Sequence, residues 1–288
     1  MAIQRFPPLE ELAIRETRDA LHAYSRILGA WLKSYRSKRK HWWHLSLRLS
    51  LNGLTTGVIN GEIDFEIELD LRHSELHVRT ATGGNLSETL TGQPVCELAD
   101  VVSGFLAARG IDNADRAQAI QEAGQDTRFD AYSPEQADLM ARVLTDVAAT
   151  LKRFRANIRE ECSPIQLWPH HFDLSMLWLP GEKVPGQNPA DEESADKHMN
   201  FGFTFGDEGI AEPYFYVTAY PLPESLPDMP LSAGTAWRSE PFSGAVLRYK
   251  TLADMSHPDN YLLDLCTRLL SAGRERMLER SARREEVK

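Results

Sequence analysis

Residues 168–175, with the sequence Trp-Pro-His-His-Phe-Asp-Leu-Ser, form the densest cluster of chemically useful side chains in the chain. The segment reads as a β-strand, in which successive side chains point to opposite faces. His171, Asp173 and Ser175 would then lie on one face, opposite Phe172 and Leu174. An imidazole, a carboxylate and a hydroxyl would share a surface, so the pattern indicates where a site lies without fixing a reaction.

Two later segments carry a similar alternation of polar and apolar side chains. His198 and Asn200 fall on one face of the first, and Tyr214 and Tyr216 fall on one face of the second. If these faces coincide with that of Asp173, one surface holds imidazoles, a carboxylate, an amide and phenols. We therefore predict a small-molecule-binding protein with a polar pocket around Asp173. Its predicted ligand-binding residues are His171, Asp173, Asn200, Tyr214 and Tyr216.

The same residues allow other interpretations. His171, Asp173 and His198 would suit Zn²⁺ or Fe²⁺, because two imidazoles and one carboxylate leave coordination positions open. The alternative function is then a metal-assisted hydrolase or oxygenase. A Ser175–Asp173–His171 triad is a weaker alternative, because the sequence has no nucleophile elbow. A structural role, in which Asp173 fixes His171 and the tyrosines pack, also stays open.

Composition limits the class of partner. The 288 residues are 42% hydrophobic and 26% charged, as is typical of a globular domain. A net charge of −10 argues against extended binding to nucleic acid or anionic membranes, which rests on positive potential. Cys96, Cys162 and Cys266 are far apart and lack metal-ligand spacing, so we expect reduced thiols. No leader peptide or long apolar run is evident, and the expected location is the cytoplasm.

A local basic run follows the first predicted helix. Cations near the C-terminal end of a helix complement its dipole, so a solvated helix end is the simplest interpretation and an anion site is the alternative. A second group of arginines crowds the last predicted helix. The basic run comprises Lys33, Arg36, Lys38, Arg39 and Lys40, and the arginine group comprises Arg274, Arg276, Arg280, Arg283 and Arg284.

The elements that must position these residues follow from apolar periodicity. Spacings of three and four residues predict helices, and alternation predicts strands. Ser133-Pro134 is a sharp helix start, with an N-cap serine and a proline at the first helical position. The predicted helices cover residues 9–35, 97–109, 133–158 and 258–281. The predicted strands cover residues 45–51, 63–71, 76–78, 165–179, 198–205, 214–220 and 245–249.

Both halves of the chain thus read as helix, antiparallel strands, helix. The predicted fold is α+β, an antiparallel sheet packed against helices. We expect residues 1–288 to form a single compact unit, with a pseudo-duplication of about 1–110 and 133–288 as a further prediction. Polar residues 111–132 read as a linker or surface excursion, and residues 181–197 as a candidate lid loop. The carboxylates at 64, 66, 68 and 70 read as a solvated row with arginine partners Arg48, Arg72 and Arg79.

Several short motifs together resemble an uncharacterised bacterial family catalogued as a domain of unknown function (DUF5996-like). The motifs span about residues 40–249 in a fixed order. They are Lys-His-Trp-Trp-His at 40–44, Gly-Leu-Thr-Thr-Gly at 53–57, Ser-Pro at 163–164, Phe-Asp-Leu at 172–174, Asn-Phe-Gly-Phe at 200–203 and Glu-Pro-Tyr-Phe-Tyr at 212–216. The resemblance implies a soluble, single-unit bacterial protein and brings no reaction with it. Asp173 matches the family pattern, whereas His170 and His171 depart from it, which weakens a catalytic role for both histidines.

Overall fold

The computed structural model of the protein describes residues 5–111 and 127–285, and the chain within it divides into two compact units. Unit 1 comprises residues 1–8, 146–165 and 174–288, and unit 2 comprises residues 9–145 and 166–173. Antiparallel sheets and long helices make up both, which confirms the α+β class. The predicted internal duplication stays a prediction. No helix among the described residues is long and apolar enough to cross a membrane.

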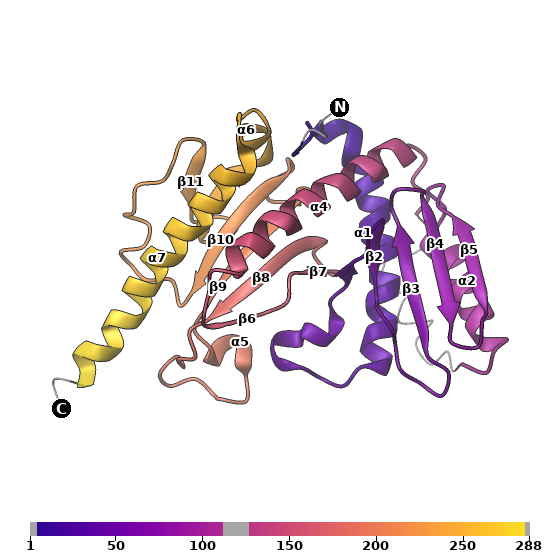
Figure 1. Cartoon of the computed structure of the whole chain (residues 1–288), viewed down its shortest axis with the longest axis horizontal. Helices are drawn as coiled ribbons and strands as arrows, with labels where there is room; N and C mark the ends of the chain where they lie inside the picture. Colours follow the sequence, from indigo (N-terminus) through magenta and orange to yellow (C-terminus); the bar gives the residue numbers. More distant parts are fainter. Residues whose placement is uncertain (1–4, 112–126, 286–288) are drawn as a thin grey trace. The chain divides into compact units, whose positions relative to one another are not determined.

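Unit 2 is built on a meander of short strands in the order β1-β2-β3-β4-β5, with each neighbouring pair antiparallel. Figure 1 shows β2 to β5 side by side. The strands are β1 (Arg48–Leu49), β2 (Gly53–Thr55), β3 (Phe65–Asp70), β4 (Glu75–Thr80) and β5 (Asn85–Thr89). The other elements are α1 (Glu11–Tyr35), the 3₁₀ helix η1 (Lys40–Leu45), α2 (Val95–Ala107), β7 (Gln166–Trp168) and α4 (Pro134–Arg155), which continues into unit 1.

Alternation on β3 separates the two faces of this sheet. Phe65, Ile67 and Leu69 are buried on one face, and the Trp31 ring of α1 meets the Phe65 ring edge to face at 5.8 Å. The carboxylates of β3 occupy the other face. Burial of the apolar side chains under α1 supplies the main stabilising term for this unit.

Unit 1 is built on a second sheet, with strands in the order β11-β12-β10-β9-β8-β6. Every strand pair with an assigned register in this unit is antiparallel. The strands are β6 (Glu161–Cys162), β8 (Asp173–Leu179), β9 (His198–Thr204), β10 (Tyr214–Tyr220), β11 (Thr235–Arg238) and β12 (Gly244–Arg248). The helices are α5 (Glu192–Ala195), α6 (Tyr249–Ala253) and α7 (Pro258–Glu285), together with the second part of α4.

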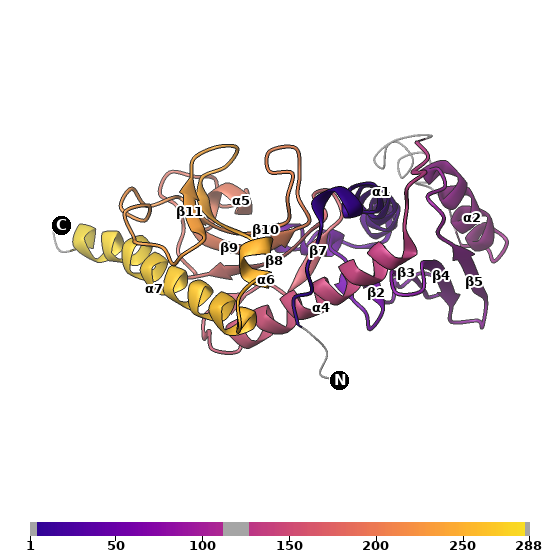
Figure 2. The ribbon, with the colours of Figure 1, turned by 90° about the horizontal axis from the view of Figure 1, so that it is seen from above.

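Two long helices cover one face of the unit 1 sheet, which we call its helix side. The Phe154 ring of α4 packs on the Phe201 ring of β9 at 4.7 Å, and leucines of α7 approach Phe215 of β10. Figure 2 shows α4 and α7 on this side, and α5 with connecting loops on the opposite side. We call the opposite face the loop side. The alternate residues of each strand therefore point away from the long helices.

The helix boundaries predicted from capping residues agree with the structure. The Gln136 amide donates to the Ser133 hydroxyl oxygen at 3.3 Å, which confirms the predicted start of α4. Gly110 follows α2 with a φ of 76°, a left-handed conformation that glycine adopts without strain. Of the predicted linker at 111–132, residues 112–126 lie outside the described residues. Strands β2, β5, β6 and β11 were not predicted.

The predicted strand at 45–51 is confirmed only in part. Only Arg48 and Leu49 are in a strand, and Leu51, which the alternation would bury, is 92% exposed. The reason lies just upstream, where His41 and Trp42 both adopt left-handed backbone conformations inside the 3₁₀ turn. This turn changes the chain direction, and it extends to Leu45, the first residue of the predicted strand.

Candidate functional site

The histidine-rich segment is a turn rather than a strand. Residues 169–172 form the turn between β7 and β8, and Phe172 has a φ of 54°, which reverses the alternation at that residue. The predicted row of His171, Asp173 and Ser175 on one strand face is therefore wrong. His171 is exposed, whereas Asp173 opens β8 and is only 7% exposed.

Contacts with α1 hold this turn in place within unit 2. The His22 ring stacks on the Phe172 ring at 5.6 Å, and its Nε2 lies 3.2 Å from the His170 carbonyl oxygen. Burial, aided by the positive charge of Arg26, lowers the pKa of His22 to about 4. Burial and the charge of His171 likewise lower the pKa of His170 to about 4. These two imidazoles are thus neutral at pH 7, and the His22 contacts anchor the turn.

The predicted metal ligands, His171, Asp173 and His198, stay a prediction. Across the described residues, no group of three or more His, Cys, Asp or Glu side chains is arranged to hold a metal ion. The polar side chains that do come together lie within unit 1, on the loop side of its sheet.

Strands β9 and β10 bring two of the predicted ligand-binding residues together on the loop side. In their register, Tyr216 lies opposite Gly202, and Thr218 lies opposite Asn200. The Tyr216 ring covers Gly202 so closely that a Cβ there would lie 2.2 Å from the ring, so a side chain at 202 would displace the phenol. The Asn200 amide nitrogen lies 3.5 Å from the Tyr216 hydroxyl oxygen.

The Asn200 side chain has an unmet hydrogen-bonding atom. Its Oδ1 is buried and accepts no hydrogen bond from any described residue. Turning the amide over would exchange the two atoms and leave the nitrogen unmet instead. An unsatisfied buried polar atom is costly and uncommon in proteins. A hydrogen bond between a ligand and the Asn200 side chain would remove this cost.

Next to Asn200, the rings of His198 and Tyr220 lie 5.5 Å apart on directly opposed positions of β9 and β10. The His198 Nδ1 lies 2.9 Å from the Asp196 carbonyl oxygen, which orients the imidazole. His198 is therefore on the same face as Asn200, as the alternation predicted.

Tyr214 differs from Tyr216. It is 2% exposed, and its hydroxyl donates to the Asp207 carboxylate. Tyr214 packs in a small apolar cluster with Ile210 and Val246, against which Phe242 also lies. This predicted ligand-binding residue therefore forms part of the apolar packing behind the site.

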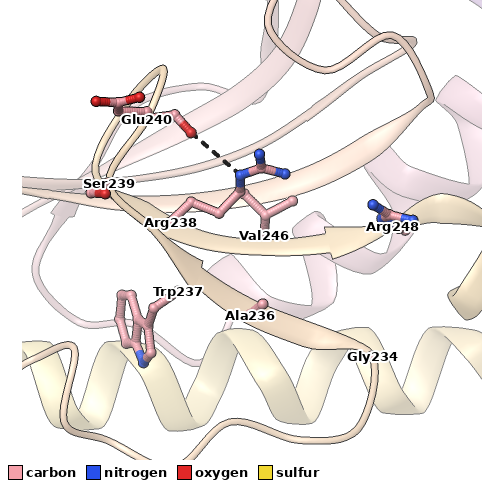
Figure 3. Close-up of a pocket in the computed structure, with 8 residues that line it drawn as sticks. All are labelled: Gly234, Ala236, Trp237, Arg238, Ser239, Glu240, Val246 and Arg248. Atoms are coloured by element: carbon pink, nitrogen blue, oxygen red, sulfur yellow. Dashed lines mark hydrogen bonds between the residues drawn. The ribbon is translucent and has the colours of Figure 1, made fainter.

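A pocket of about 460 Å³ lies beside this cluster, on strands β11 and β12. Ala236 and Val246 are direct cross-strand partners and form its apolar floor. Figure 3 shows the Arg238 and Val246 side chains on one side of the hairpin and Trp237 on the other. The lining residues are Gly234, Ala236, Trp237, Arg238, Ser239, Glu240, Val246 and Arg248.

Arginines stand at both ends of the pocket floor. The Arg238 Nε donates to the Glu240 carbonyl oxygen at 3.3 Å, and the Arg248 Nε lies 3.1 Å from the Glu212 carboxylate. In the Cα register, Arg238 and Arg248 lie on opposite sides of the Ala236–Val246 pair, with a backbone spacing of roughly 13 Å along the strands at about 3.3 Å per residue. In both arginines the contact is made by Nε. The two terminal nitrogens of each guanidinium can then donate a pair of hydrogen bonds to a carboxylate.

Sequence reasoning missed this pocket. Strand β11 is only four residues long and follows a segment rich in proline, so its alternation carries little signal. Arg248 ends a strand that was predicted, but only the cross-strand pairing places it beside Ala236 and Val246.

A second pocket, of about 370 Å³, lies between the end of α4 and β6 and includes Lys152, Arg155 and Cys162. Burial raises the pKa of the Cys162 thiol to about 11, which keeps it protonated and a poor nucleophile at pH 7. All three cysteines are free thiols, as predicted, and only Cys266 is fully buried.

Comparison with known proteins agrees with the motif resemblance. A search of curated proteins and a search of solved structures each found no match. The sequence model of a family of unknown function, DUF5996, matches residues 6–278. With nearly the whole length matched, the chain belongs to the DUF5996 family.

Proposed function

We propose that this protein binds a small molecule that carries carboxylate groups, on the loop side of the unit 1 sheet. The observation that carries the proposal is the pair Arg238 and Arg248 at the two ends of an apolar pocket floor. Its volume of about 460 Å³ lies within the usual range of ligand pockets, about 300–1,000 Å³. The proposed protein class, a small-molecule-binding protein, is the one predicted from the sequence, but the proposed pocket lies on β11 and β12 and not around Asp173.

Charge and shape favour an elongated dianion. Two guanidiniums separated by Ala236 and Val246 suit a ligand with an apolar middle and an acid group at each end. The proposed site continues toward Asn200, because Val246 pairs directly with Tyr216, whose hydroxyl lies near the amide. A polar substituent that meets the Asn200 amide would add specificity, since a buried unmet atom discriminates strongly between ligands.

Titration of linear dicarboxylates by calorimetry tests the proposal. Glutarate, adipate and pimelate should bind, and the corresponding monocarboxylates should bind more weakly. Arg238→Gln and Arg248→Gln should each weaken the best dicarboxylate about tenfold or more, because a charged hydrogen bond contributes roughly 1.5–3 kcal/mol.

The matched control is Arg142→Gln, which removes an exposed arginine paired with Asp138 in unit 2 and should leave binding unchanged. Absence of binding by every dicarboxylate at millimolar concentration would refute the ligand class. Equal binding by Arg238→Gln, Arg248→Gln and the unmodified protein would refute the site.

A further inference from the structure

Unit 2 gathers positive charge between the end of α1 and strand β2. The Arg36 guanidinium donates to the carbonyl oxygens of Thr56 at 2.6 Å and Val58 at 3.3 Å. Arg48, on β1, pairs in the sheet with Thr55, the residue before Thr56. Two arginines, one just after α1 and one on β1, thus lie around the same end of β2. Burial, together with the charge of Arg48, lowers the pKa of Arg36, as expected for neighbouring cations.

The connecting turn adds a third cation. The Lys38 ammonium lies 4.7 Å from the centre of the Trp42 ring, and the Trp42 ring stacks with the His44 ring at 5.7 Å. Left-handed conformations at His41 and Trp42 shape this turn, with φ values of 47° and 58°. Such conformations typically cost about 1–3 kcal/mol each and persist only where surrounding contacts impose them. The turn therefore holds Lys38 beside the aromatic pair.

His44 supplies a neutral donor to the same region. Its Nδ1 accepts a hydrogen bond from the Arg39 backbone amide at 3.2 Å, so the ring proton of the neutral form is on Nε2. Burial first, and then the charges of Lys38 and Arg36, lower the pKa of His44. His44 is thus close enough to both cations to respond to their charge.

These cations differ from several other arginines among the described residues in having no acidic partner. Within the part of the chain that the structure describes, no ion pair joins Arg36, Lys38 or Arg48 to a carboxylate. By contrast, Arg79 pairs with Glu68, Arg153 with Asp259 and Arg274 with Glu160. In a protein with a net charge of −10, three grouped cations that lack acidic partners are a local exception.

We propose that Arg36, Lys38 and Arg48 bind the phosphate group of a small phosphorylated ligand, with the His44 Nε2–H as a further donor. The cations come from two segments, with Arg36 and Lys38 just after α1 and Arg48 on β1, and a tetrahedral dianion suits such spread donors, whereas a carboxylate suits a single planar fork. The site lies wholly in unit 2 and is independent of the dicarboxylate pocket in unit 1.

Inorganic phosphate and phenyl phosphate are the probes, titrated into the full chain at constant ionic strength and followed by calorimetry. Lys38→Gln and Arg48→Gln should each weaken phosphate binding about tenfold or more, and Arg142→Gln should leave it unchanged. Arg36→Gln is avoided because Arg36 also supports the carbonyl groups of Thr56 and Val58, so this variant could fail to fold.

Three outcomes would overturn the proposal. One is a response to sodium chloride as large as the response to phosphate. Another is unchanged phosphate binding in both Lys38→Gln and Arg48→Gln. The third is co-sedimentation with phosphatidic acid vesicles without binding of either soluble phosphate, which would assign the patch to lipid headgroups instead.

Discussion

The two sheets of this protein each carry polar side chains opposite their apolar core, but these side chains are satisfied in different ways. On the unit 2 sheet, Glu68 pairs with Arg79 at 2.7 Å, and Asp70 accepts hydrogen bonds from Asn52 and His73. On the unit 1 sheet, the buried Oδ1 of Asn200 has no hydrogen-bond partner among the described residues. The carboxylate row is richer in charge, yet its members satisfy one another. The charge on the unit 2 face is therefore paired internally, and an unmet hydrogen-bonding atom is the feature that sets the unit 1 face apart.

The prediction of a solvated carboxylate row needs correction at Glu68 and Asp70, which are both buried. Asp70 is 4% exposed, and only Arg79 of the three expected arginine partners contacts the row. Arg72 pairs with Asp138 instead. Asp70 is held within unit 2 by a set of short contacts, which makes it a structural residue.

The largest expected effect is at Asp70. Asp70→Asn replaces an acceptor of two hydrogen bonds at one oxygen, from Asn52 and the His73 ring, by a group that can donate. We expect a loss of about 1–3 kcal/mol in the free energy of unfolding, measured by urea denaturation. Glu62→Gln, at an exposed position of the same unit, is the control and should change stability little. Equal stability of the two variants would show that the hydrogen bonds of Asp70 within unit 2 do not stabilise the fold.

A smaller effect is expected at Asn200. Asn200→Ala removes an amide with one unmet polar atom, so the loss of packing is partly offset by relief of that burial cost. We expect less than about 1 kcal/mol of change in the free energy of unfolding in the same assay. A loss as large as that of Asp70→Asn would mean that the amide is fully satisfied, and the contrast between the two sheets would fail.

Regular periodicity predicted much of the fold. Strand β10 occupies the predicted residues 214–220, and β9 ends within one residue of its predicted boundary. Both strands are long and alternate strictly, so the pattern also placed Asn200 and Tyr216 on one face. Helix α1 begins two residues inside its predicted start and ends at the predicted Tyr35. In such segments, local pattern and tertiary packing favour the same structure.

The failures share a physical cause. His41, Trp42 and Phe172 adopt left-handed backbone conformations without being glycine, so no turn signal marks the places where the chain reverses. The reversal at Phe172 lies inside a predicted strand, and the reversal at His41 and Trp42 lies just before another. The Arg238–Arg248 pocket was missed for another reason, because it depends on the pairing of β11 with β12 and not on either segment alone.

The smallest expected effect is a pH dependence at the Asp70–His73 contact. Burial alone would raise the pKa of Asp70, but hydrogen bonds from His73 and Asn52 outweigh burial and lower it. Its contribution to stability is therefore present above the unfolded value of 3.8 and is lost as the pH falls through the lower folded value. The hydrogen bond to Asp70 raises the pKa of His73, so the contribution of His73 is present below 6.5 and is lost as the pH rises through its higher folded value.

Melting temperatures of the unmodified protein and His73→Gln, measured from pH 5 to pH 9, test this assignment. The unmodified protein should be more stable at pH 5–6, and the difference should shrink as the pH rises above 6.5, because the imidazolium loses its proton in both the folded and unfolded states. The exposed His73 ring is accessible to salt, so added sodium chloride should reduce the difference at pH 5. A difference that stays constant across the whole range would show that the contact is a neutral hydrogen bond, and that the unit 2 face is held together without this charge pair.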